Sequence, residues 1–220
     1  MVNYWLIVHD LSSYEQHPDK IGLNTKRANS DRIFRTIKKG DRIVYYAKNK
    51  EAIGIFKVAS EGHISERGCW GKKAGYHFIY DIEPIYVTPS GMPAIIEATR
   101  YGIKSLQGRT AVKLTKDQFK DIKSDVMGMD DPRCENGVVS VFAKLHRFLG
   151  FPYLRTVQSR FPDCIAVDLK GKEVRIEFEE PSDNFDHDPK KCDLIVCWKD
   201  TLGSLSEVQI LELSEVIYGH

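Results

Sequence analysis

A polar segment at residues 123–136 divides this chain and constrains its fold more than any other feature. It contains Gly128 and the turn-forming sequence Asp130-Asp131-Pro132. Short β-prone apolar runs precede it, whereas apolar residues at helical spacing follow it. A chain of 220 residues is long enough for two small domains. We therefore predict two modules, residues 1–125 and 133–220, joined by a linker at residues 126–132.

The two modules differ in charge. Residues 1–125 carry 21 Lys and Arg against 14 Asp and Glu, whereas residues 126–220 carry 11 against 17. A basic module suits a polyanion, and an acidic module suits metal ions or is merely well solvated. A chance distribution is the simpler alternative for an excess of this size.

The composition, 42% hydrophobic and 29% charged residues, indicates an ordinary folded protein. No apolar run reaches the roughly 18–20 residues that a membrane span needs, and we read no signal peptide at the N-terminus. The five cysteines are an odd number without a Cys-x-x-Cys pair, which argues against a disulfide framework and a structural zinc site. We expect a cytoplasmic protein with no membrane partner.

The first module shows β-prone runs separated by turns, with strands expected at residues 4–9, 42–47, 52–58 and 77–87. A short helix is expected after Asn29 or Ser30. Thr115 and Gln118 form a capping box that opens a second helix through about Ile122. Residues 12–29 are polar and are expected to be a long loop. This pattern predicts a small β-rich module.

The second module begins with a helix, because Val138, Val141, Phe142 and Leu145 recur at helical spacing before a stop at Gly150. Strands are expected at residues 164–168, 172–178, 193–198 and 207–213. The predicted order is αβββ with a last β-strand.

The first two of these strands form a predicted hairpin that brings acidic side chains together. If its loop is Leu169-Lys170-Gly171, Asp163 lies opposite Glu177. Directly opposed side chains have Cβ atoms about 4.5–5.5 Å apart, so the two carboxylates repel unless a cation lies between them. Alternation places Arg175, Glu177 and Glu179 on one face and the apolar residues between them on the other.

Pro162-Asp163 followed by Glu177-Phe178-Glu179, in this helix–hairpin–strand context, resembles the PD-(D/E)xK nuclease core. The resemblance covers residues 133–213 and implies hydrolysis of a DNA phosphodiester with Mg²⁺ or Mn²⁺. It implies that Asp163 and Glu177 ligate the metal and that Glu135, at the start of the helix, adds another acidic group.

One position departs from the pattern of that family. Glu179 stands where the family usually has Lys, and an acid cannot supply a positive charge. Glu179 would instead ligate metal or act as a base, and Lys144, Arg175, Lys190 and Lys191 are possible substitutes for the lysine. The alternative is a solvated acidic strand end. His187 could touch substrate or metal, although a lone His is more often structural.

The first module also resembles a known family, the EVE domain, a PUA-like β-barrel related to YTH domains. The resemblance is carried by Tyr-Trp-Leu at residues 4–6, Lys-Lys-Gly-Asp at 38–41, Gly-Ile-Phe-Lys-Val at 54–58, Ile-Lys-Ser-Leu at 103–106 and Gln-Phe-Lys-Asp-Ile at 118–122. It implies binding of nucleic acid, often through a modified base held in an aromatic pocket.

Aromatic walls and polar groups are what such a pocket requires. The candidates are Trp70, Trp5 and Tyr46 as stacking walls, Asn24 and Ser105 as groups that read the base edge, and Lys104 and Arg109 as phosphate contacts. Trp70 is the first candidate because it lies in a Gly-rich loop, whereas a strand Trp is more often a core residue. Solvated charge is the default for any single Lys or Arg.

The two resemblances together predict a PUA-like (EVE) β-barrel followed by a restriction-endonuclease-like core, an α+β and α/β chain. They imply a modification-dependent DNA endonuclease that finds a modified base in DNA and cuts nearby, as a homodimer where both strands are cut. The first alternative is a non-catalytic binder of modified DNA or RNA with a degenerate nuclease core. The second is an enzyme that acts on RNA or tRNA.

Overall fold

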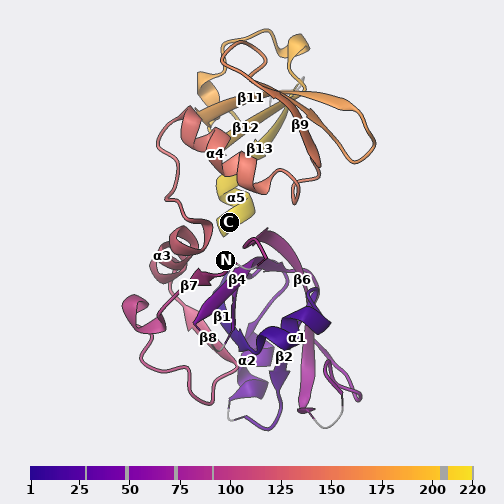
Figure 1. Cartoon of the computed structure of the whole chain (residues 1–220), viewed down its shortest axis with the longest axis vertical. Coiled ribbons are helices and arrows are strands. Elements are labelled where there is room, and N and C mark those ends of the chain that lie inside the picture. The colour runs from indigo at the N-terminus through magenta and orange to yellow at the C-terminus, as the bar shows by residue number, and fades with distance from the viewer. Residues whose placement is uncertain (28, 48–49, 72–73, 91, 204–207, 220) are drawn as a thin grey trace. The chain divides into compact units, whose positions relative to one another are not determined.

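The computed structural model describes residues 1–27, 29–47, 50–71, 74–90, 92–203 and 208–219. The chain folds into two compact units (Figure 1). One comprises Met1–Asp130 together with Gly219, and the other comprises Asp131–Tyr218. Each unit mixes helices with one β-sheet, and the division between them falls inside the segment 126–132.

The N-terminal unit is built on a curled, eight-stranded sheet. Six of its strands follow the order β2-β6-β4-β3-β1-β8, and the other two are the short strands β5, which pairs with β6, and β7, which pairs with β4. Its strands are β1 Tyr4–His9, β2 Lys20–Asn24, β3 Arg42–Ala47, β4 Glu51–Val58, β5 His63–Ile64, β6 Tyr76–Val87, β7 Ala94–Ile95 and β8 Ala111–Leu114. β1 pairs with β3 in parallel and with β8 antiparallel. The curl encloses a core that includes Ile7, Ile21, Ile43 and Phe56, all almost fully buried.

The described helical segments that accompany this sheet are α1 Leu11–Gln16, α2 Ser30–Thr36, the 3-10 turn η2 Ala98–Tyr101 and α3 Lys116–Met127. α3 begins with the predicted capping box, in which the Thr115 side chain accepts a hydrogen bond from Gln118 N and the Gln118 side chain accepts one from Thr115 N. The box satisfies two backbone donors at the start of the helix.

Most expected elements of this unit are confirmed within one residue, β3 with its predicted bounds. Two expectations were wrong. Residues 12–29 do not form one long loop, because they contain most of α1 and the whole of β2, which pairs with β6. α3 continues to Met127 rather than ending near Ile122, because Val126 and Met127 extend its buried face.

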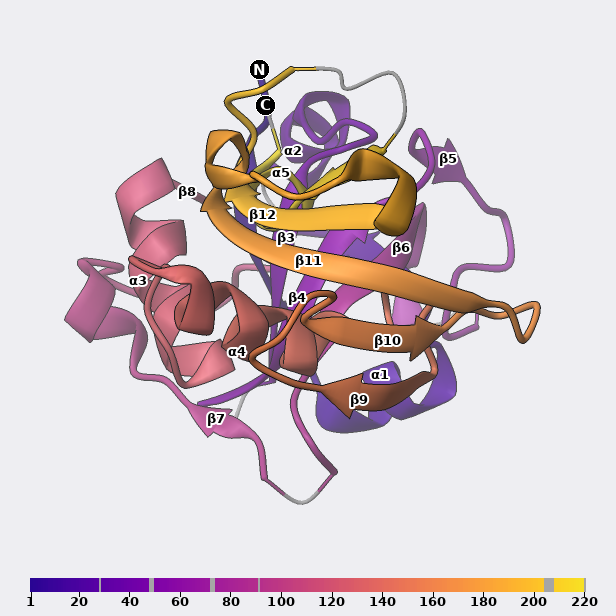
Figure 2. The ribbon, with the colours of Figure 1, turned by 90° about the horizontal axis from the view of Figure 1, so that it is seen from above.

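The C-terminal unit has a five-stranded mixed sheet with the order β13-β12-β11-β10-β9. The strands are β9 Tyr153–Val157, β10 Cys164–Val167, β11 Glu173–Pro181, β12 Leu194–Lys199 and β13 Gln209–Glu212. β9, β10 and β11 are antiparallel neighbours, whereas β11, β12 and β13 run parallel. Figure 2 shows β9 to β12 side by side in chain order.

The helices of this unit pack on the middle of the sheet. α4 Glu135–Leu145 packs against β11 and β12, with the Phe142 ring 5.2 Å from the Phe178 ring between centroids. α5 Leu213–Tyr218 packs on β12, and two 3-10 turns, η3 Ser182–Asn184 and η4 Pro189–Lys191, connect β11 to β12. Within the described ranges, none of the helices is long and apolar enough to cross a membrane.

Two features of this unit differ from the expected order. β9 was not foreseen, because four of its five residues are exposed at the sheet edge and the strand lacks a buried alternating pattern. The final strand ends at Glu212 rather than at residue 213, since α5 begins at Leu213, and position 207 of the expected strand lies outside the described residues.

Candidate nucleic-acid interface and candidate metal centre

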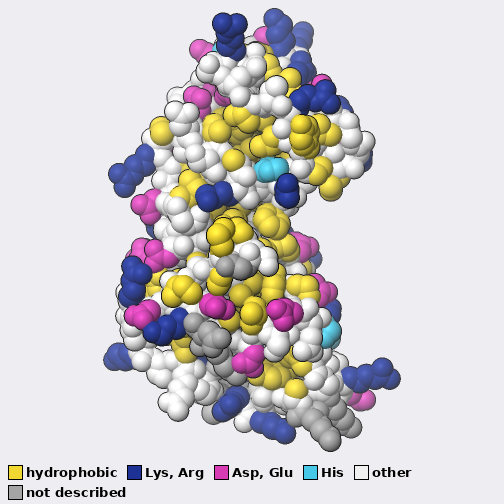
Figure 3. Space-filling model, viewed as in Figure 1, with side chains coloured by type: hydrophobic (Ala, Val, Ile, Leu, Met, Phe, Trp, Pro, Cys, Tyr) yellow, Lys and Arg dark blue, Asp and Glu magenta, His cyan; other side chains and the backbone are white. Residues whose placement is uncertain are grey.

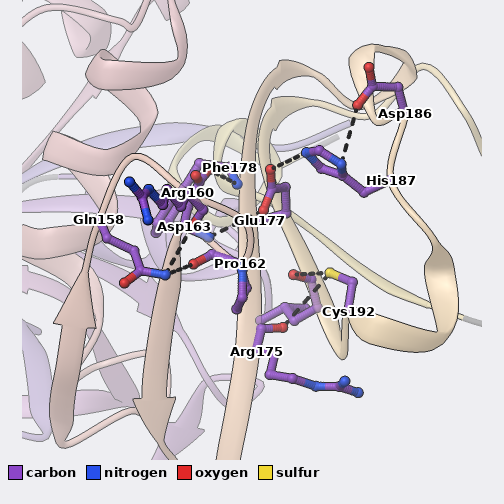
Figure 4. Close-up of polar contacts among 11 residues, drawn as sticks. Gln158, Arg160, Pro162, Asp163, Arg175, Glu177, Phe178, Asp186, His187 and Cys192 are labelled. Atoms are coloured by element: carbon purple, nitrogen blue, oxygen red, sulfur yellow. Dashed lines mark hydrogen bonds and ion pairs between the residues drawn. The ribbon is translucent and has the colours of Figure 1, made fainter.

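The β10–β11 hairpin has the register that the sequence predicts. Cys164 pairs with Ile176 and Val167 with Glu173, which places Asp163 opposite Glu177. Asp163 N donates to Glu177 Oε2 at 3.2 Å, and Phe178 N donates to Asp163 Oδ2 at 3.1 Å (Figure 4). Each acidic side chain is thus bonded to the backbone beside its partner, so both carboxylates are held at one place on the sheet.

Four carboxyl groups influence one another here. Burial raises the pKa of Asp163, Glu177 and Glu135, and the Asp163 charge raises the pKa of the latter two further. The largest effect falls on Glu179, whose side chain is buried on β11. Burial, followed by the charges of Glu135, Glu177 and Asp163, raises the pKa of Glu179 to about 7. These four groups form an acidic cluster, which we define as Glu135, Asp163, Glu177 and Glu179; Glu177 and Glu179 are buried, Asp163 is half-buried and Glu135 is exposed.

Cationic side chains offset little of this charge. Within the part of the chain that the structure describes, the only ion pair to the acidic cluster is that of His187, with Nε2 3.4 Å from Glu177 Oε1. Arg175 points away from Glu177 (Figure 4) and bonds to Asp193 instead, with Nε 2.9 Å from Oδ2. This pair holds the pKa of Asp193 at about 2. Arg175 therefore does not replace the lysine missing at position 179.

The other candidate replacements also lie outside the ion pairs of the cluster. Lys191 Nζ lies 4.0 Å from Asp188 Oδ2, and neither Lys144 nor Lys190 has a described ion pair with the four carboxylates. On the face seen in Figure 3, Lys and Arg side chains lie around the edge of this unit. The unit carries cations at its surface rather than at the acidic cluster.

Whether this site could bind a divalent metal depends on the donor atoms that are present. Among the described residues, no group of three or more His, Cys, Asp or Glu side chains is placed to hold a metal ion. Mg²⁺, however, is usually bound by one or two carboxylates together with waters and substrate phosphates. Asp163 and Glu177, paired across the hairpin, fit that kind of site and do not fit a cage built from protein ligands alone.

The N-terminal unit contains two neighbouring cavities at its basic side. The first, of about 480 Å³, is lined by Val8, Arg27, Tyr46, Lys50, Tyr76, Leu106, Gln107, Gly108, Arg109 and Thr110. The second, of about 590 Å³, is lined by Trp5, Arg27, Asn29, Arg32, Ile33, Thr36 and residues 108–113. Arg27, Gly108, Arg109 and Thr110 line both. We call the first the tyrosine cavity and the second the arginine cavity.

The tyrosine cavity combines two phenol rings with basic side chains. Tyr46 comes from β3 and is almost fully buried, and burial raises the pKa of its hydroxyl. Tyr76 comes from the start of β6 and is half-buried. Lys50 is bound to Glu97, with Nζ 2.6 Å from Oε1. None of the described residues that line this cavity is an Asp or Glu. Its size lies within the range of about 300–1,000 Å³ found for small-ligand pockets.

The arginine cavity is built around a fixed indole. Trp5 Nε1 donates to Asp41 Oδ2 at 2.9 Å, and the same buried carboxylate accepts from Asn3 N and Lys38 N. Lys113 Nζ lies 5.9 Å from the centroid of the Trp5 ring. These bonds orient the indole, because a buried carboxylate is retained only where donors satisfy it.

The comparison with protein families decides the identity of the N-terminal unit. The family model of the EVE domain matches residues 3–124, which is more than half of the chain.

This chain belongs to the EVE domain family.

Solved structures that resemble the EVE domain share little sequence with it. Protein Atu2648 from Agrobacterium tumefaciens is 14% identical, with a TM-score of 0.43, and the alignment covers 60% of this chain and 97% of that one. Human THYN1 in complex with 5-methylcytosine-containing DNA is 16% identical, with a TM-score of 0.41, covering 56% and 96%. The YTH domain-containing protein mmi1, in complex with RNA, is 13% identical, with a TM-score of 0.43, covering 57% and 82%. No curated protein matches the chain.

Three predicted contact residues of the EVE domain line the cavities. Tyr46 lines the tyrosine cavity, Trp5 the arginine cavity, and Arg109 both. Lys104 and Ser105 are exposed nearby and line neither, and Ser105 Oγ accepts a hydrogen bond from Gln107 N. The structure thus groups three of the seven predicted residues at one place.

Trp70 and Asn24 lie elsewhere in the EVE domain. The Trp70 ring packs 4.7 Å from His9 and 4.9 Å from Tyr76 between centroids, and Nε1 donates to Ser13 O at 3.0 Å. Asn24 Nδ2 donates to Ala74 O, and Oδ1 accepts from Lys26 N. Trp70 therefore supports Tyr76 without lining the cavity, and the Asn24 amide holds two loops together.

Several residues that line the cavities were not identified from the sequence, chiefly Arg27, Arg32, Lys113 and Tyr76. They come from a loop, a helix and two strands that are distant in the chain. An unpaired Arg in a polar loop is an ordinary surface feature, so no local signal distinguishes Arg27 before the sheet order is known.

Proposed function

We propose that the EVE domain binds a nucleic acid by accepting one modified base into the tyrosine cavity. The observation that carries this proposal is the lining of that cavity, in which Tyr46 and Tyr76 lie with Arg27 and Arg109 and without an acidic residue. Aromatic rings stack on a base taken out of its strand, and Arg guanidinium groups contact the adjacent phosphates. THYN1 was solved with DNA that contains 5-methylcytosine, and mmi1 was solved with RNA. Both polymers are therefore necessary test ligands.

A binding titration with fluorescent oligonucleotides tests this proposal. One sequence is prepared as DNA, as DNA with 5-methylcytosine or another modified base, and as RNA with and without a modified base. We expect one modified form to bind at least several-fold more tightly than its unmodified counterpart. Tyr46→Leu should abolish this selectivity and Arg109→Ala should lower affinity for all forms. Equal affinity of the wild-type protein for every form contradicts base recognition.

A second candidate function concerns the C-terminal unit: we propose that it hydrolyses phosphodiester bonds with a divalent metal. The observation that favours it is the pairing of Asp163 with Glu177 at the end of a three-stranded antiparallel meander, beside Glu135 and Glu179. Bound Mg²⁺ would polarise the phosphate and lower the pKa of an attacking water. Asp163 and Glu177 would hold the metal through one carboxylate each.

Glu179 would act on the proton of the water rather than on charge at the phosphate. A carboxyl group with a pKa of about 7 is partly ionised at neutral pH, and a general base is most effective when its pKa lies near the working pH. His187, whose Nε2 lies 3.4 Å from Glu177 Oε1, orients that ligand. With the metal held by Asp163 and Glu177 and the proton accepted by Glu179, no lysine is required at position 179.

Together the two proposals describe a modification-dependent endonuclease, and the rival is a non-catalytic binder. Plasmid DNA with and without modified bases is incubated with Mg²⁺ or Mn²⁺ and the wild-type protein, Asp163→Ala or Glu177→Ala. Metal-dependent cleavage of modified DNA that both variants abolish supports the enzyme. Binding of modified DNA without cleavage under any condition supports the rival, and cleavage of RNA alone supports an RNA enzyme. Sedimentation with and without DNA tests for a homodimer.

A further inference from the structure

The arginine cavity concentrates positive charge. Arg27, Arg32, Arg109 and Lys113 line it and all four are exposed, whereas none of the described residues that line it is an Asp or Glu. Within the described residues, none of these four side chains has an ion pair with a carboxylate. Cations gathered in a concave site without counter-charge attract an anion, because their fields add in the cavity.

Several other basic side chains of the same unit are paired with carboxylates. Lys20 bonds to Asp81, Lys57 to Glu83 and Arg100 to Asp125. On α2 itself Arg35 bonds to Asp31, with Nε 3.0 Å from Oδ2, whereas Arg32 faces the cavity without such a partner. The arginine cavity therefore brings together four basic side chains that have no described carboxylate partner.

We propose that the arginine cavity binds a backbone phosphate of the same strand whose base enters the tyrosine cavity. This inference rests on the proposed base binding, since both cavities must serve one ligand. The two cavities share Arg27, Gly108, Arg109 and Thr110 as a common wall. A Cβ atom built on Gly108 would lie 3.8 Å from Arg27 Nη1, so the guanidinium and the glycine backbone lie against each other in that wall.

The geometry gives the bound strand a direction across the wall. A flipped base on one side leaves its sugar and phosphate at the wall, and the next phosphodiester reaches the second cavity. Arg side chains suit this role because the guanidinium donates two parallel hydrogen bonds to phosphate oxygens. The minimum ligand is therefore a modified nucleotide with a neighbouring phosphodiester, and a free nucleoside binds only half of the site.

The test separates phosphate contacts from base contacts by substituting residues that line one of these two cavities and not the other. Arg32→Ala and Lys113→Ala change the arginine cavity and leave the tyrosine cavity intact, Tyr46→Leu changes the tyrosine cavity and leaves the arginine cavity intact, and Arg35→Ala is the matched control on α2. Affinity for a single-stranded oligonucleotide with the modified base is measured between low and moderate salt. A matched oligonucleotide carries neutral methylphosphonates beside that base.

We expect Arg32→Ala and Lys113→Ala each to weaken binding equally for modified and unmodified strands, and to reduce the slope of log K against log salt by about 0.7 per lost contact. The methylphosphonate strand should bind the wild-type protein with the same reduced slope. Arg35→Ala should leave affinity and slope unchanged. Titration with inorganic phosphate, followed by the Trp5 indole NMR signal, shows whether a free anion enters the same cavity.

The outcomes distinguish this inference from the proposed function. Selective binding that Tyr46→Leu removes, with Arg32→Ala and Lys113→Ala indistinguishable from wild type, overturns the phosphate site and leaves the base site standing. A wild-type protein that binds every strand without selectivity, yet loses affinity in both cavity variants, overturns base recognition and keeps the phosphate site. A response to inorganic phosphate without any weakening on oligonucleotides assigns the cavity to a free anion and overturns the strand phosphate.

Discussion

The two units of this chain each gather charge of one sign, but they do so in opposite ways. The EVE domain collects Arg27, Arg32, Arg109 and Lys113 on exposed cavity walls, where water solvates them. The C-terminal unit collects its carboxylates on the sheet, with Glu177 5% and Glu179 9% exposed. Exposed like charges cost little in folding, whereas buried ones are expensive unless they are neutralised.

This difference indicates how each unit is prepared for its ligand. The cavity cations are exposed, so a polyanion could reach them directly. The acidic cluster lowers its cost by taking up protons, as the raised pKa of Glu179 records, and a divalent cation would displace those protons. Under the proposed functions, the EVE domain would provide affinity for nucleic acid at its surface, and the acidic cluster would bind a small cation.

The largest expected effect comes from a substitution in the acidic cluster of the C-terminal unit. Glu177→Ala should lower metal-dependent cleavage at least about 100-fold, because a catalytic metal stabilises several kcal/mol of charge in the transition state. Glu173→Ala, on the same strand and paired with Arg155 at the surface, is the control and should retain activity. Cleavage rates under metal saturation measure the effect, and equal rates for the two variants would remove Glu177 from the site.

The pH dependence of stability tests the acidic cluster in a second way. The pKa of Glu179 is raised from 4.5 to about 7 in the folded state, so the folded protein binds this proton more tightly than the unfolded chain. The stabilisation is complete below about pH 4.5 and is lost as pH rises through 7, and it amounts to about 3 kcal/mol. Hydrogen exchange of the β11 amides at pH 5 and pH 8 measures it.

Two controls accompany that measurement. Glu179→Gln should remove most of the difference between the two pH values, because its amide does not titrate. Mg²⁺ at pH 8 should restore protection in the wild-type protein by neutralising the cluster. Protection in the wild-type protein that is the same at pH 5 and pH 8 would contradict a raised Glu179 pKa.

A change behind the tyrosine cavity tests whether Trp70 is a packing residue. Trp70→Phe removes the bond to Ser13 O and part of the contact with His9 and Tyr76. We expect a loss of about 1–2 kcal/mol in the free energy of unfolding, with unchanged selectivity between modified and unmodified strands. Denaturant unfolding and the oligonucleotide titration measure both. Selectivity lost without a loss of stability would place Trp70 at the base instead.

The smallest effect concerns paired cations outside the cavities. Lys57→Ala removes an exposed pair in which Nζ lies 3.2 Å from Glu83 Oε2. Such pairs contribute about 0–1 kcal/mol, so both stability and affinity for oligonucleotides should change little. A drop in affinity comparable to that of Arg32→Ala would show that total charge, rather than the arrangement in the cavity, determines binding.

Local interactions account for what could be predicted from the sequence. The capping box at Thr115 depends on residues three positions apart. The pairing of Asp163 with Glu177 depends on one short hairpin loop, so counting outward from Gly171 was sufficient. Both are fixed by neighbours in the chain. The EVE motifs likewise reach the correct family because they are contiguous runs.

Long-range arrangement accounts for what could not be predicted. The two cavities exist because β1 lies between β3 and β8, which brings Tyr46 and Arg109 together from positions 63 residues apart. The burial of Glu179 follows from the packing of β11 inside a five-stranded sheet, one strand of which, β9, has no apolar pattern. Trp70 was favoured because of its Gly-rich loop, whereas the structure packs it against Gly22, where a Cβ atom would lie 2.8 Å from its ring.

The wall shared by the two cavities limits how this protein can change its ligand during evolution. A substitution at Arg27 or Arg109 alters both cavities at once, so a mutant with a new base preference would also lose its hold on the strand. Residues that line one cavity only, such as Tyr46 or Leu106, escape that constraint. A library that varies these positions and keeps the wall intact is the shorter route to a reader of a different modification.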